Sequence, residues 1–164
     1  LKNFGILSET ECFDVGTNAK MNEMQALMGL LILKVIDELI AHRKVIFNTY
    51  KGVFSGDIDA SLLERPKTMY GLLIEHNYAY CPVLFYSFDI REKVYAVLKE
   101  YNVFSRRYFY LLWTDFAPYQ DCKAETPVSR EIASRVLTLP TYHGLDCGEV
   151  KHMAEIVRMI AMRV

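Results

Sequence analysis

Three side chains have the type and position to do chemistry on an anion: Asn18, Arg106 and Arg107. Asn18 follows Gly16 and Thr17 in a polar turn just before an apolar helix, where an amide NH2 group can donate to a phosphate oxygen. The guanidinium groups of the two arginines match the geometry of phosphate. Because successive residues of a strand point to opposite faces, we expect at most one of these arginines to face a site.

Each of these residues also has a plain structural interpretation. Asn18 can cap a turn locally or adopt the left-handed conformation, and residue chemistry alone favours this interpretation. Arg106 and Arg107 can equally be two residues of a solvated surface strand. The sequence by itself therefore leaves both alternatives open.

Most motifs of a self-contained enzyme are absent from the sequence. It has no GxSxG motif, no glycine-rich phosphate loop and no paired Asp/Glu motif. The four cysteines and four histidines are scattered, without the spacing of a zinc or redox site, so we expect no metal. His143 precedes Gly144, which favours a turn residue over a general base.

Composition predicts a single packed domain. The chain has 164 residues, of which 52% are hydrophobic and 13% aromatic. With 19 basic and 20 acidic residues the net charge is −1, so neither nucleic acid nor an anionic membrane is an expected partner. Scattered cysteines favour a cytoplasmic protein, and the longest uncharged apolar run, 26–33, is too short to span a bilayer. The missing initiator Met suggests a fragment or a processed piece.

A long helix is predicted from Asn22 to about Phe54. Asn22 is a good N-cap, and Gln25 can reach back to it as in a capping box. The first half of the helix is apolar nearly all round, so we expect it to be buried by the core or by a partner. Gly29 costs about 1 kcal/mol relative to Ala in a helix, a cost usually offset by close approach of another backbone.

The remaining pattern predicts an α+β fold, with helices on one face of a short antiparallel sheet. Strands are expected over 77–85, where Pro82 indicates an edge or a bulge, and over 104–112. A helix over 89–103, capped by Asp89, carries charges spaced as on a solvated face. Further helices are expected over 128–140 and 147–164.

Several segments, taken in order, resemble the C-terminal part of the DegT/DnrJ/EryC1/StrS family. These are sugar aminotransferases that use pyridoxal 5′-phosphate and have the aspartate-aminotransferase fold (fold type I). The resemblance covers essentially the whole chain, and its most specific part is the elbow VGTNAKM with QALMGL behind it; the other segments are LKNFG, NYAYCPVLF, SRRYFYLLWTDFAPY and ASRVLTLPTYHGLD. It implies that residues 1–164 form the small C-terminal domain, without the large cofactor-binding domain.

The resemblance also implies where the chemistry lies. The Schiff-base lysine is expected before Leu1, so no catalytic residue is expected in this chain, and neither Lys2 nor Lys20 is expected to replace it. Asn18 is expected to contact the cofactor phosphate in trans, across a homodimer. The apolar residues of the first helix are expected to cover that dimer contact and the large domain: Met24, Leu27, Met28 and Leu31.

The expected substrate follows from the segment SRRYFYLLWTDF. Leu111 replaces a proline common in relatives, and the WTDF loop resembles transaminases acting on nucleotide-linked 4-keto-6-deoxy sugars. No histidine stands in this loop, so no substrate-contacting histidine is expected there. The implied reaction transfers an amino group, with glutamate as donor, to a nucleotide-linked keto sugar in amino-sugar biosynthesis, with Arg106 or Arg107 contacting a substrate phosphate.

Two alternatives remain open at this stage. The parent can be a sugar dehydratase of the same family, in which a histidine replaces the lysine upstream of Leu1. The chain can also be a stand-alone module for binding or dimerisation. For the chain alone we expect no transaminase activity, no tight cofactor binding, and exposed apolar surface around Met24–Leu31.

Overall fold

The computed structural model describes residues 6–8, 11–12, 19–54, 68–69, 72–108, 110, 112, 115 and 125–162. The chain divides into two compact units, residues 1–38 and 39–164. The first contains the antiparallel pair β1 (Ile6–Ser8) and β2 (Glu11–Cys12), followed by α1 (Glu23–Leu33). Helix α2 (Ile36–Phe54) begins at the end of this unit and continues through the second.

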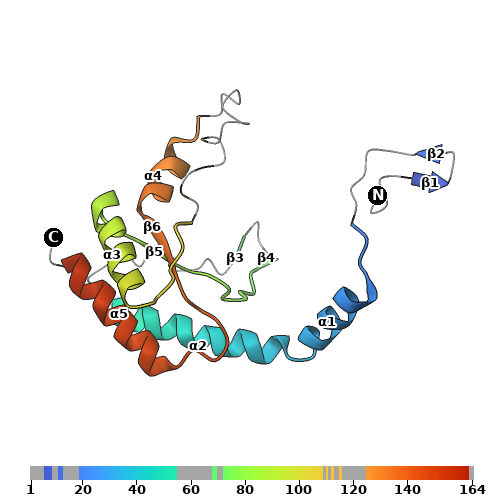
Figure 1. Ribbon diagram of the computed structural model, residues 1–164, viewed down its shortest axis with the longest axis horizontal. Coiled ribbons are helices and arrows are strands. Elements are labelled where there is room, and N and C mark those ends of the chain that lie inside the picture. Colours follow the sequence, from blue (N-terminus) through green and yellow to red (C-terminus); the bar gives the residue numbers. More distant parts are fainter. Residues whose placement is uncertain are drawn as a thin grey trace. The chain divides into compact units, whose positions relative to one another are not determined.

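The second unit is built on a small antiparallel sheet of β5 (Cys81–Leu84) and β6 (Val136–Leu139). Its other elements are the hairpin of β3 (Thr68–Met69) and β4 (Leu72–Leu73), and the helices α3 (Phe88–Glu100), α4 (Pro127–Arg135) and α5 (Cys147–Met162). Helices α3 and α5 pack side by side (Figure 1). This arrangement confirms the predicted α+β architecture.

One face of the sheet joins three helices to form the core. Its inward residues pair across the strands, Cys81 with Leu139 and Val83 with Leu137. The helices contribute apolar side chains at three- and four-residue spacing, the pattern of a buried helical stripe. These are Ile46, Tyr50 and Phe54 of α2, Ile90, Val94 and Leu98 of α3, and Val150, Ala154 and Val157 of α5.

The predicted long helix is two helices, and this is a correction. The N-terminal prediction is confirmed: Gln25 N–H donates to Asn22 Oδ1 (2.9 Å) and Asn22 N–H donates to Gln25 Oε1 (3.1 Å), a complete capping box. The helix ends after Leu33, where the N–H of Val35 bonds to the Ile32 carbonyl in a tight turn. No Gly or Pro stands at the break, so the sequence carries no local signal for it.

The predicted helix over 128–140 is also wrong in its second half. Helix α4 ends at Arg135 and the chain continues directly into β6. All four β6 residues, Val-Leu-Thr-Leu, are buried, so they show no alternation that would identify a strand. Among the described residues of the predicted strand over 104–112, the pairing is a single bridge, Arg106 with Thr138, on the other side of β6.

Among the described residues β5 pairs with β6 alone, so it is an edge strand, as predicted from Pro82. Pro82 lies opposite Thr138, whose N–H and C=O both bond to Arg106 instead. In antiparallel pairing the backbone groups of such a position point away from the neighbouring strand, so the missing N–H of Pro82 costs no bond to β6. The helix that follows is capped by Ser87, whose Oγ accepts from Ile90 N–H, and not by the predicted Asp89.

Tyr50 provides a test of this core. It is fully buried, and its hydroxyl donates to the Pro140 carbonyl (3.2 Å), joining α2 to the end of β6. We predict that Tyr50→Phe lowers the free energy of unfolding by about 1–3 kcal/mol, because a buried acceptor loses its donor. Urea denaturation of the 164-residue chain measures this change. The control Tyr101→Phe, at an exposed position, should change stability by under about 0.5 kcal/mol; equal effects would contradict the prediction.

Candidate functional site

Arg106 is held by its backbone and presents its side chain to solvent. Its N–H donates to the Thr138 carbonyl (3.0 Å), and Thr138 N–H donates to the Arg106 carbonyl (2.8 Å). This exchange attaches the segment after α3 to the free side of β6. The Arg106 side chain is exposed, and no ion pair joins it to any residue that the structure describes.

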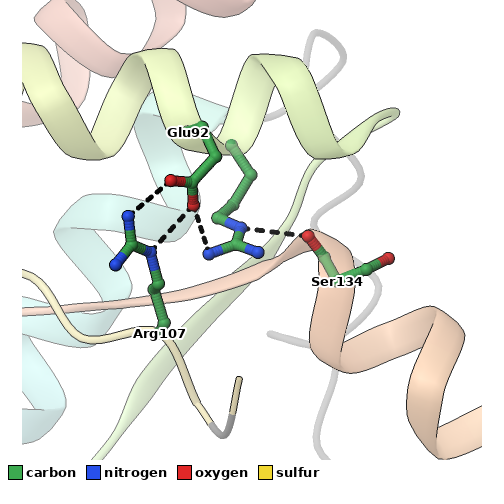
Figure 2. Close-up of polar contacts among 4 residues, drawn as sticks. Glu92, Arg107 and Ser134 are labelled. Atoms are coloured by element: carbon green, nitrogen blue, oxygen red, sulfur yellow. Dashed lines mark hydrogen bonds and ion pairs between the residues drawn. The ribbon is translucent and has the colours of Figure 1, made fainter. Parts of the chain in front are cut away.

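Arg107 has different surroundings. Its Nε donates to Glu92 Oε1 (2.8 Å), and its Nη2 forms an ion pair with Glu92 Oε2 (Figure 2). The guanidinium also lies over the ring of Tyr95, with Cζ 3.9 Å from the ring centroid. The hydrogen bond to Glu92 raises the pKa of Arg107, while partial burial acts in the opposite direction. Arg107 is thus already engaged on α3, whereas Arg106 is available to a ligand.

Arg91 completes a cluster that the sequence did not predict. It was expected on a solvated helix face, yet it is fully buried, which is a correction. Its Nε donates to the Ser134 carbonyl (3.0 Å), and Nη1 lies 2.5 Å from Glu92 Oε1 (Figure 2). The guanidinium also lies over two neighbouring rings, with Cζ 4.7 Å from the centroid of Tyr110 and 5.0 Å from that of Phe88.

Burying the charged guanidinium of Arg91 costs electrostatic free energy. Burial lowers the pKa of Arg91, and the charge of Glu92 counteracts this. Neither Nη atom has an aligned hydrogen-bond acceptor among the described residues. Nη1 instead makes its polar contact through the ion pair with Glu92. The sequence carried one indication that Arg91 is buried: it directly follows Ile90, which belongs to the apolar stripe of α3.

The other predicted site residues divide between described and undescribed parts of the chain. Asn18 lies outside the described residues, as does Lys2. A cofactor lysine must be buried beside the cofactor. Every described lysine is exposed, so none fits that role: Lys20, Lys34, Lys44, Lys51, Lys93, Lys99 and Lys151. His143 lies in a turn beside Gly144, which has φ 89°, as predicted.

Within the described ranges, no group of three or more His, Cys, Asp or Glu side chains is placed to hold a metal ion. Among the described helices, none is both long and apolar enough to cross a membrane.

Comparison with known proteins identifies the family. The model of the DegT/DnrJ/EryC1/StrS aminotransferase family matches residues 1–158. The chain belongs to this family. Members of the DegT/DnrJ/EryC1/StrS family therefore provide the reference for the α+β unit and for the segment that carries Arg106.

Two curated relatives in the family share a function by name. The dTDP-4-amino-4,6-dideoxy-D-glucose transaminase of Shigella dysenteriae is 35% identical over 164 residues, covering 98% of this chain and 43% of its own length. The Escherichia coli protein of the same name is 33% identical over 152 residues, covering 89% and 40%. The chain thus spans about two fifths of the length of these relatives.

Solved structures confirm the fold. DesI, crystallised in the presence of its TDP-sugar product, is 28% identical with a TM-score of 0.79, over 99% of this chain and 41% of its own. Spr1654 from Streptococcus pneumoniae, in its PLP form, superposes with a TM-score of 0.76 at 17% identity, over 99% and 42%. The second likeness is one of fold alone.

The two arginines provide a test of the site geometry. We predict that Arg107→Met lowers the free energy of unfolding by about 1 kcal/mol, because it removes a two-point ion pair and a cation–π contact at a partly exposed position. Arg106→Met, which removes no ion pair with a described residue, should change it by under about 0.5 kcal/mol. Chemical denaturation of both variants measures the difference, and a larger effect of Arg106→Met would contradict the geometry.

Proposed function

We propose that this chain is the small C-terminal domain of an aminotransferase that uses pyridoxal 5′-phosphate and acts on a nucleotide-linked keto sugar. The observation that carries the proposal is the pair of transaminases at 33% and 35% identity, which match 89–98% of this chain. The reaction would transfer an amino group from glutamate, in amino-sugar biosynthesis in the cytoplasm. Because the chain spans only 40–43% of those relatives, the remaining machinery belongs to the rest of the polypeptide.

The cofactor is assigned to the whole protein, not to this domain. When bound, pyridoxal 5′-phosphate carries the amino group between donor and keto sugar. The described part of the chain holds no buried lysine for it. We therefore assign the domain's own residues to binding and orientation, and we expect the 164-residue chain alone to be inactive.

Arg106 is the residue we assign to the substrate. Its guanidinium is exposed, lacks an ion-pair partner among the described residues, and is attached to a rigid strand through two backbone hydrogen bonds. A charged fork on a fixed backbone suits a nucleotide phosphate. Arg107, held by Glu92, is the weaker candidate for this contact.

Helix α1 supports a homodimer. None of its residues is buried in this chain, and exposed fractions reach 68% for Met24, 55% for Met28 and 66% for Leu33. This confirms the predicted exposed apolar surface. A Cβ added at Gly29 would meet nothing within 4 Å, so no described residue supplies a backbone that compensates the glycine. A second subunit or the large domain would cover this face, and Asn18 would then reach the partner's cofactor phosphate.

The two alternatives receive less support. A sugar dehydratase of the same family shares this domain, but both curated relatives are transaminases by name. A stand-alone dimerisation module is favoured only by the exposed face of α1.

The substrate assignment predicts the kinetics of Arg106→Ala in the longest natural polypeptide that contains this sequence. With dTDP-4-keto-6-deoxyglucose as acceptor and glutamate as donor, KM for the sugar nucleotide should rise about tenfold or more, because one charge-assisted hydrogen bond is lost. Lys151→Ala, an exposed cation on α5, is the control and should leave KM unchanged. A wild-type polypeptide without transaminase activity would refute the proposed function.

The dimer assignment predicts different behaviour for two variants of the same polypeptide. Met28→Glu should produce monomers with weakened cofactor binding, because a charge is placed in an apolar interface. Asn18→Ala should weaken cofactor binding while the dimer persists. Analytical ultracentrifugation and cofactor titration measure both, with Val128→Glu, at an exposed apolar position on α4, as control. Monomeric wild-type protein would contradict the assignment.

A further inference from the structure

Glu92 is the central group of the polar cluster in Figure 2. Its Oε1 contacts Arg91 Nη1 (2.5 Å) and accepts from Arg107 Nε (2.8 Å), while its Oε2 pairs with Arg107 Nη2. One carboxylate therefore serves two guanidinium groups, one of them fully buried. No other acidic side chain among the described residues forms an ion pair with either arginine.

Arg107 and Arg91 attach the segment after Arg106 to α3; the described residues of this segment are Arg107, Tyr108 and Tyr110. Arg107 follows Arg106 directly and is held by Glu92 and by the ring of Tyr95. Farther along, the ring of Tyr108 contacts that of Tyr80 (4.9 Å between centroids), and the ring of Tyr110 lies on the Arg91 guanidinium. Arg91 is oriented in turn by the Ser134 carbonyl and by Glu92. The segment is thus attached to α3 through two cations that share one anion.

The direction of Arg106 follows from this attachment. In extended backbone, successive side chains point to opposite sides, so an Arg107 turned toward α3 directs Arg106 away from it. The backbone pair with Thr138 fixes the position of Arg106 along β6. The contact between Arg107 and Glu92 adds a second restraint, on the residue that follows.

Removing the charge of Glu92 would leave the two guanidinium groups facing each other. Burial lowers the pKa of Arg91, and the nearby positive charge of Arg107 acts in the same direction, because like charges repel. Without the carboxylate, Arg107 would lose its ion pair and be repelled by Arg91, and the segment would depend on ring contacts, such as that of Tyr110 with Phe88, to stay on α3.

We propose that Glu92 is a positioning residue that acts through Arg107 to orient Arg106 toward the nucleotide phosphate of the substrate. The inference rests on the proposed function, in which Arg106 makes that contact. Glu92 itself lies on the α3 side of the segment and touches no substrate.

The test uses Glu92→Gln in the longest natural polypeptide that contains this sequence. We expect KM for dTDP-4-keto-6-deoxyglucose to rise about fivefold with kcat within about twofold, since a misdirected Arg106 weakens substrate binding but not the chemistry. Glu92→Asp, which keeps the charge, should recover most of the loss. Glu131→Gln is the matched control, because Glu131 also pairs with an arginine, Arg135, on a helix.

A double-mutant cycle decides whether Glu92 acts through Arg106. In an Arg106→Ala background, Glu92→Gln should add no further increase in KM, and an equal increase in both backgrounds would overturn the inference. Arg106→Ala with an effect and Glu92→Gln without one would overturn it while leaving the proposed function intact. Arg106→Ala without effect would instead refute the substrate role of Arg106, and the inference with it. If Glu92→Gln fails to fold, Arg107→Met replaces it in the same cycle, with the same outcomes.

Discussion

The pairing of β6 with its two neighbours is the interaction on which the rest of this unit depends. On one side β6 pairs with β5, and Leu137 and Leu139 of its inner face join the core of three helices. On the other side Thr138 exchanges two backbone hydrogen bonds with Arg106. The strand that completes the core therefore also places the arginine proposed to bind substrate. Because strand spacing is fixed by hydrogen-bond length, Arg106 inherits the rigidity of the core.

The cluster around Glu92 shows how a buried cation is accommodated at the edge of that core. A fully buried guanidinium is expensive unless it is paired and hydrogen-bonded. Arg91 meets this requirement in part, through the Ser134 carbonyl, the Glu92 carboxylate and the rings of Phe88 and Tyr110, while its Nη atoms have no aligned acceptor among the described residues. The same carboxylate serves Arg107, so the electrostatics of α3 and of the segment after it are linked. A carboxylate that offsets the cost of burying one cation can in this way also set the direction of a neighbouring residue that binds a ligand.

Helix α1 presents the opposite situation, an apolar surface that none of the described residues buries. Its capping box makes the helix start well defined, and yet none of its residues is buried. An isolated helix of 11 residues is marginal in water, so packing against another surface would contribute most of its stability. This is consistent with a chain that spans about two fifths of its relatives' length and whose α1 would pack on the rest of the assembly.

The sequence alone determined those features that depend on neighbours a few residues apart. The capping box at Asn22, the presence of helices α3 and α5, and the edge position of Pro82 were all predicted, because each follows from local hydrogen bonding or periodicity. The family resemblance also located the segment with Arg106 and Arg107. Only tertiary structure decided that Val136–Leu139 is a strand, since its four buried residues fit a helix or a strand until β5 pairs with them. Tertiary structure likewise separated the two arginines and buried Arg91, because the positions of their partners, Glu92, Thr138 and Ser134, are set by long-range packing that local spacing does not contain.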